Sequence, residues 1–191
     1  MSAESNLWLE DKILSVKASF AGAFLNARAQ RKLLEQLLSV RSRRVRPGHP
    51  SLADVYQDLA HNYLGYHIDD LNYADQLAQE ALNILEFNAP KDSQGGPGGK
   101  SFRMGTLIHL RCQIRQRMNR PQEALQFGEE ALAIYNANNK LINHQRSSVM
   151  HTLVHLNNEV GNHERAERLA QEVKILDQVL MSRAARGRIG M

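Results

Sequence analysis

The sequence predicts an all-α fold built from repeated pairs of antiparallel helices. Three stretches share one arrangement of small and bulky residues, and each follows a segment whose apolar residues recur every three or four positions. That spacing places the apolar side chains on one face of a helix. Leu, Ala, Gln, Glu and Arg are plentiful and Pro is scarce, which also favours helix. The three stretches are 70–85, 119–135 and 161–176.

The three stretches align residue by residue, so the sequence contains an internal repeat. Ala124 aligns with Ala74 and with Ala166. The spacing from Ala124 to Ala166 is 42 residues, whereas Ala74 and Ala124 are 50 apart, because a Gly/Pro-rich insertion occupies 88–101. Small residues let the two helices of a pair approach closely, and stacked pairs bury a core that one pair alone could not. Small or β-branched residues align again seven positions later: Ala81, Ala131 and Val173.

The first 50 residues predict two further helices that would cap the stack. We interpret 1–50 as a degenerate first repeat with a basic end, and the alternative is one long helix packed across the first clear repeat. The apolar residues of 7–25 include Leu7, Leu9, Ile13, Val16, Phe20 and Phe24. Those of 27–45 are Leu33, Leu34, Leu37, Leu38 and Val40.

The remaining chain is expected to hold three repeats over 51–180 and a basic C-terminal tail over 181–191. In the second repeat the register of the first helix is open by one residue, because Arg111 or Arg115 falls where an apolar residue is expected. The expected first helices are 51–66, 102–118 and 144–161.

This pattern resembles the tetratricopeptide repeat (TPR). Its Leu-Ala-x-x-Tyr motif occurs at 59–63, and its Gly-x-Tyr-x-x-Ala turn occurs at 161–166 with His163 in place of Tyr. Its Ala-Leu-x-Ile motif occurs at 81–84 and 131–134, and the 42-residue spacing resembles the subtype seen in kinesin light chains. The resemblance implies a right-handed α-solenoid and a non-enzymatic role in protein–protein interaction. Such an adaptor or assembly subunit would bind a peptide or helix in its concave groove.

The resemblance also implies which side chains would line that groove. They lie one and five places after the first large apolar residue of each first helix, here Tyr56 and Met150. These polar, His-rich positions would suit an extended peptide or a partner helix, and the other interpretation is that they are only solvated. The Lys and Asn that the family uses for carboxylate-terminated chaperone tails are absent, so a co-chaperone role is not supported. The predicted groove residues are Gln57, His61, His109, Gln113, His151, His155, Asn158 and Glu159, with Ile108 and Cys112 as the alternative register in the second repeat.

The sequence offers no candidate for catalysis, for a cofactor or for a metal ion. Lys100 and Ser101 follow a glycine run, but Gln94 stands where a phosphate-binding loop needs its first Gly, and no strand precedes it. His151 and His155 have metal-ligand spacing without an evident third ligand. Cys112, the only cysteine, is expected to be a small core residue. We therefore expect a protein that is not an enzyme.

The net charge of +4 is concentrated in two basic segments. Residues 28–46 carry a net +6 and residues 181–191 a net +3. These segments could steer an acidic partner protein or contact phosphates of nucleic acid. No aromatic residues interleave with the arginines, which argues against binding to nucleic acid. Association with nucleic acid through 41–46 and 183–188 is therefore the alternative function and not the main one. The arginines are Arg41, Arg43, Arg44, Arg46, Arg183, Arg186 and Arg188.

The last predicted helix, 163–181, has an apolar face that we expect to be covered by self-association or by a constant partner. No apolar run approaches the roughly 20 residues of a membrane span, and the acidic start lacks a secretory signal. We expect a cytoplasmic protein, with organellar import left open by the Arg-rich stretch 12–46. The apolar face comprises Leu169, Val173, Leu176, Val179 and Leu180.

Overall fold

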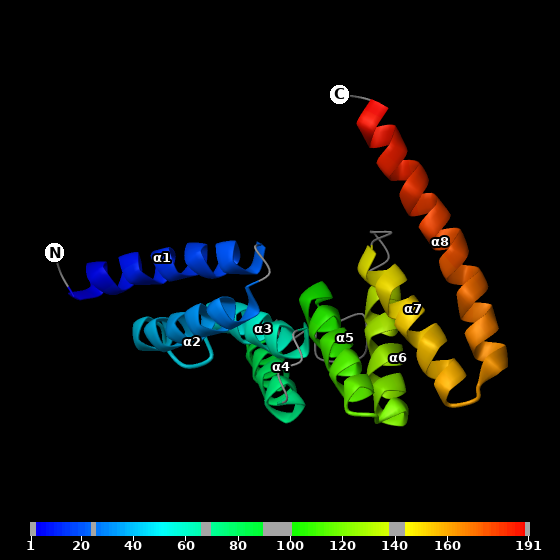
Figure 1. The fold of residues 1–191 in the computed structure, drawn as a ribbon, viewed down its shortest axis with the longest axis horizontal. Helices are drawn as coiled ribbons and strands as arrows, with labels where there is room; N and C mark the ends of the chain where they lie inside the picture. Colours follow the sequence, from blue (N-terminus) through cyan, green and yellow to red (C-terminus); the bar gives the residue numbers. More distant parts are fainter. Residues whose placement is uncertain (1–2, 24–25, 66–69, 90–100, 138–143, 190–191) are drawn as a thin grey trace. The chain divides into compact units, whose positions relative to one another are not determined.

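The structure, a computed structural model, describes residues 3–23, 26–65, 70–89, 101–137 and 144–189, with side chains as far as Ala185. Within these ranges all regular secondary structure is α-helix, and no strand occurs (Figure 1). The prediction of an all-α fold is confirmed. The helices are α1 (Ala3–Ala23), α2 (Ala27–Arg44), α3 (Pro50–Gly65), α4 (Leu71–Phe87), α5 (Phe102–Arg117), α6 (Pro121–Ala137), α7 (His144–Glu159) and α8 (His163–Ile189).

The chain divides into two compact units, Met1–Ala89 and Pro90–Met191, and each is described by itself. In the first unit, α1 packs on α2 and α3 packs on α4, and α2 also packs on α3. In the second unit, α5 packs on α6 and α7 packs on α8, and α7 also contacts α6 and α5. Consecutive helices therefore form pairs, and neighbouring pairs stack within each unit, as the repeat pattern predicts.

The aligned alanines occupy equivalent places in the second helix of each pair. Ala74, Ala124 and Ala166 are the fourth residues of α4, α6 and α8, and each is at most 2% exposed. Each backbone N–H donates to the carbonyl oxygen four residues earlier, at 3.0 to 3.1 Å, so the first turn of each helix is closed in the same way. The prediction on which the repeat assignment depends is confirmed.

The N-terminal segment forms two helices, so the alternative of one long helix is wrong. The side chain of Asn26 accepts a hydrogen bond from the Ala29 N–H at 3.1 Å, which starts α2 with an N-cap.

The face that α1 buries differs from the apolar stripe read from the sequence. Asp11, Leu14 and Ala18 are buried, whereas four side chains of the expected stripe are 43% to 61% exposed. The exposed residues are Leu9, Ile13, Val16 and Phe20.

The basic segment near the end of the chain is helical as far as Ile189. Helix α8 continues to Ile189, beyond residue 181 where we expected it to end. No Pro or capping Gly interrupts residues 177–186, and the arginines near the end favour a helix C-terminus.

Residues 90–100 of the predicted insertion lie outside the described residues. Of the helices that the structure describes, none combines the length and apolar character needed to cross a membrane.

Candidate functional site

Helix α7 fills a groove between α5 and α6. Cys112 and Ala124 form a buried cluster with Leu156 of α7. A Cβ atom added at Gly128 of α6 would lie 2.7 Å from Leu153 Cδ2, a distance that real Cβ atoms essentially never show. Any larger residue at this position would therefore force the buried Leu153 side chain of α7 to shift.

A polar contact at the same interface fixes the position of α7. The Nε2 atom of His109 lies 3.2 Å from Oγ1 of Thr152, and the His109 side chain is buried. Burial also raises the pKa of the Cys112 thiol to about 12, so this cysteine is a neutral core residue. The groove between α5 and α6 is thus a closed contact of apolar side chains with one buried histidine.

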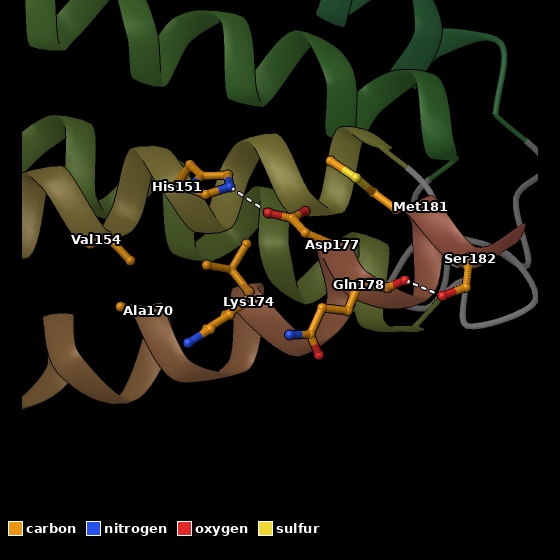
Figure 2. A pocket seen from close by; sticks show the side chains of 9 residues that line it. His151, Val154, Ala170, Lys174, Asp177, Gln178, Met181 and Ser182 are labelled. Carbon is orange, nitrogen blue, oxygen red and sulfur yellow. Dashed lines mark hydrogen bonds and ion pairs between the residues drawn. The ribbon is translucent and has the colours of Figure 1, made fainter. Parts of the chain in front are cut away.

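A second groove, between α7 and α8, is open (Figure 2). Its volume is about 750 Å³. Figure 2 shows His151 and Val154 of α7 on one side and the side chains of α8 on the other. Aliphatic and polar side chains share the lining, so the groove can bury an apolar face and also make hydrogen bonds. The lining residues are His151, Val154, Ala170, Val173, Lys174, Asp177, Gln178, Met181 and Ser182.

The open groove is the repeat equivalent of the filled one. The 42-residue offset carries His109 to His151, Cys112 to Val154 and Gly128 to Ala170. The first member of each pair contacts α7, and the second lines the open groove. The α7/α8 groove is therefore shaped like a groove that receives a helix.

Asp177 places a negative charge at the rim of this groove. Ser147 Oγ donates a hydrogen bond to one carboxylate oxygen, and His151 Nε2 lies 2.9 Å from the other (Figure 2). These contacts, with Ser147 the larger, lower the pKa of Asp177 below its usual value. The carboxylate is ionised at neutral pH, and the His151 ring is 59% exposed beside it. A cationic group entering the groove would meet this carboxylate.

The predicted groove residues of the second unit have different surroundings. His109 is buried against Thr152. The residues of the alternative register, Ile108 and Cys112, are also buried in the core. These three side chains contact neighbouring helices, and the partner-binding role of this position in the second repeat stays a prediction. Gln113 is half-buried.

Exposed polar residues of α7 form a separate edge beside the open groove. His155 Nδ1 lies 3.1 Å from Gln116 Nε2 and 3.4 Å from Glu159 Oε1, and Asn158 Oδ1 lies 3.2 Å from His163 Nδ1. His155, Asn158 and Glu159 are all exposed. As partner-binding residues they stay predictions.

Two predicted groove residues lie on α3 of the first unit. Gln57 is half-buried and His61 is exposed, and desolvation by its neighbours lowers the pKa of His61. Their role in binding also stays a prediction. A second hollow of about 550 Å³ in this unit contains none of the predicted site residues.

The basic patch at the end of α2 is partly used inside the fold. Arg41 Nη2 lies 2.6 Å from Asp11 Oδ1, and Arg44 Nη2 lies 2.9 Å from Asp11 Oδ2. Arg41 also donates to the Ser51 carbonyl oxygen at 3.1 Å. Burial alone would raise the pKa of Asp11, but the hydrogen bond and charge of Arg41 and the charge of Arg44 lower it below its usual value. These two arginines therefore hold α1 and α2 together, and their role in a partner-binding patch stays a prediction.

The other predicted arginines are exposed or lie outside the described side chains. Arg43, Arg46 and Arg183 are exposed. Arg186 and Arg188 lie within α8, and their side chains are outside the described part of the structure.

The apolar face of α8 is covered by the chain itself. Leu169, Val173 and Leu180 are 3% to 8% exposed, and Leu176 is half-buried, because α8 packs along α7. Self-association or a constant partner at this face stays a prediction, and Val173 of this face also lines the open groove. The large apolar side chains of α8 that do face solvent are Ile175 and Met181.

Sequence reasoning missed the α8 side of the groove, including Ala170, Lys174 and Asp177. The signal was present, because the 42-residue offset points from the α7-binding side chains of α5 and α6 to this groove. Using that signal required knowledge of which side chains contact α7. Among the residues that the structure describes, no three His, Cys, Asp or Glu side chains gather as a metal site requires.

Solved structures with a TPR-like fold resemble this chain. It matches the crystal structure of nearly identical TPR-like repeats assigned to a Podosopora anserina kinesin light chain at a TM-score of 0.65, with 20% identity, covering 93% of this chain and 78% of that one. A single-substitution variant of the same repeats gives a TM-score of 0.68, with 18% identity and coverage of 95% and 80%. BtubC (BKLC) from P. vanneervenii gives 0.73 with 16% identity, covering 89% of this chain and 64% of BtubC. No protein-family model matches the chain, and no curated protein is significantly similar in sequence. The chain has a TPR-like fold.

Proposed function

We propose that this chain is a non-enzymatic, cytoplasmic adaptor or assembly subunit that holds a helix of a partner protein in the α7/α8 groove. The observation that carries the proposal is the equivalence of this groove with the one that α7 fills. The TPR-like fold supports a general role as a scaffold for protein–protein interaction.

The partner segment is expected to be an amphipathic helix. Helix α7 enters its groove with a buried stripe whose members are four and three residues apart: Val149, Leu153 and Leu156. A helix satisfies its own backbone hydrogen bonds, so it can lay such a stripe into an apolar groove without leaving buried N–H or C=O groups unpaired. A partner helix with the same spacing would contact Val154 and Ala170.

The exposed edge of α7 would add polar contacts to that helix. His155, Asn158 and Glu159 lie on the helix that forms one wall of the groove. The exposed arginines Arg43 and Arg183 would steer an acidic partner towards the chain without adding much affinity. Gln57, His61 and Gln113 keep the polar contact role that the family resemblance implies.

Association with nucleic acid is not favoured. Arg41 and Arg44, half of the first arginine group, are held by Asp11. A salt titration of binding to generic RNA and DNA checks this point, and we expect no retention at low salt.

The proposal is tested by blocking the groove. Ala170→Trp places an indole in the groove, and Ile175→Trp places the same indole on an exposed site of α8 outside it. In affinity purification with the intact chain, we expect Ala170→Trp to lose the partner that the wild type retains, and Ile175→Trp to keep it. His151→Ala should weaken retention, because it removes a lining side chain. Equal retention by the wild type and Ala170→Trp would show that the groove is not the binding surface.

A further inference from the structure

Helix α1 carries an exposed apolar stripe on the face opposite its contact with α2. Leu9, Ile13 and Val16 are 43%, 43% and 55% exposed, and Trp8 beside them is 52% exposed. The opposite face, with Asp11, is the one that packs on α2. Monomeric proteins seldom expose such a row of large apolar side chains, and a row of this kind marks an interaction surface.

The stripe has the spacing of the stripe with which α7 enters its own groove. Leu9, Ile13 and Val16 are four and three residues apart, as are the buried residues of α7 at 149, 153 and 156. The opposite faces correspond as well. When the two stripes are superposed in register, Leu14 takes the place of Val154, and each of these residues lies on the side turned away from its own stripe. Helix α1 is thus built like α7 but leaves open the face that α7 buries.

We propose that α1 of one copy of this chain packs into the α7/α8 groove of a second copy. The contact continues the repeat pattern from one molecule to the next, because α1 would occupy the groove as α7 occupies the groove between α5 and α6. The inference rests on the proposed function of the groove and names its occupant as a second copy of the chain.

Charge supports this occupant. In the superposed register, Lys12 takes the place of Thr152, the residue that contacts His109 in the filled groove. In the open groove the equivalent histidine is His151, whose ring lies 2.9 Å from the Asp177 carboxylate. Lys12 is exposed, with its ammonium group 6.0 Å from the centre of the exposed Trp8 ring, and we infer that it would turn to that carboxylate in the contact. A helix with an apolar stripe and a lysine at this position matches a groove whose aliphatic side chains lie beside the Asp177 carboxylate, and the lining also includes Lys174.

The contact joins two different surfaces, so it is heterologous. A pair joined in this way would retain one unused groove on one copy and one unused α1 stripe on the other, and the assembly would grow head to tail into a ring or an open filament. An isologous dimer, in which both copies use the same surface, would stop at two chains. The two arrangements respond differently when defective copies are mixed.

The test mixes two variants of the full chain. Ile13→Asp combined with Val16→Asp breaks the stripe and leaves the groove intact, and Ala170→Trp blocks the groove and leaves the stripe intact. The wild type should assemble as its concentration rises from about 1 µM to about 1 mM, with mass followed by sedimentation velocity. Each variant alone should stay monomeric, and an equimolar mixture should form a species of two chains. Ser19→Asp and Ile175→Trp, which lie outside the two surfaces, should assemble as the wild type does.

Helicity by circular dichroism and the urea midpoint of each variant confirm that the chain still folds. Lys12→Glu should raise the dissociation constant of the wild-type assembly about 10-fold, and added salt should reduce the difference. A wild type that stays monomeric throughout the range, or variants that assemble alone, would overturn the inference. If the wild type is monomeric while Ala170→Trp still loses its partner, the head-to-tail contact is wrong and the proposed function stands. If the wild type assembles, the two variants complement each other and Ala170→Trp keeps its partner, the inference stands and adaptor binding at this groove fails.

Discussion

The groove between α5 and α6 and the groove between α7 and α8 are built from residues 42 positions apart, but α7 fills the first and the second is open. In the first, His109 is buried and Gly128 admits Leu153 at close range. In the second, His151 is 59% exposed and Ala170 lines an open hollow. The residue types are alike, so the presence of a covering helix, not the local sequence, decides which histidine belongs to the core.

The two lowered carboxyl pKa values follow the same division. Asp11 is 1% exposed between two arginines, whereas Asp177 lies at the rim of the open groove. A buried ion pair loses a great deal when one member is removed, because the remaining charges are left without a partner in a poorly solvated place. An exposed pair loses little, because water takes over the contact.

The largest expected effect is at Asp11. Asp11→Ala should lower the free energy of unfolding by about 3 kcal/mol, because Arg41 and Arg44 lose their shared carboxylate. Asp177→Ala should cost less than about 1 kcal/mol. Urea unfolding at neutral pH measures both, and equal losses would contradict the distinction between closed and open sites.

The next effect compares one substitution at two equivalent positions. Gly128→Leu should destabilise the chain by about 2 kcal/mol, because even a Cβ atom there meets Leu153 at 2.7 Å. Ala170→Leu should change stability by no more than about 0.5 kcal/mol, because its side chain enters an open groove. The same urea experiment compares the two variants, and a large loss from Ala170→Leu would show that the second groove is closed.

A smaller effect is expected for the equivalent histidines. His109→Ala should cost about 1.5 kcal/mol, since it removes a buried ring and leaves Thr152 without that contact. His151→Ala should stay within about 0.5 kcal/mol of the wild type. Thermal unfolding followed by circular dichroism is sufficient here. A comparable loss at both positions would place His151 in the core as well.

The smallest expected effect is the acid dependence contributed by Asp177. Its pKa is lowered in the folded state, so its stabilising contribution is present above the unfolded value of about 3.9 and is lost as the pH falls through the folded pKa. As the pH falls from about 5 to about 2, the free energy of unfolding of Asp177→Asn should therefore decrease less than that of the wild type. The decrease should be smaller still for Asp11→Asn. Urea midpoints across this range check the order, and unchanged acid dependence in both variants would contradict it.

The local sequence pattern was sufficient to predict the helices and their pairing. The repeated alanines required close helix contacts, and the structure buries Ala74, Ala124 and Ala166 at the same place in each second helix. The pattern was not sufficient for α1. Periodicity states which residues share a face, but two faces of α1 carry apolar residues, and the buried one is the face on which Asp11 pairs with Arg41 and Arg44.

The sequence by itself determined that this chain is helical, that its helices pair, and that Ala74, Ala124 and Ala166 are equivalent, because helix period and residue size act over a few neighbouring positions. Only the tertiary structure decided that Arg41 and Arg44 are structural, that His109 is buried, and that His151 faces an open groove with Asp177. These outcomes depend on contacts between residues 26 to 43 positions apart, and the positions of such partners are set by the packing of helices.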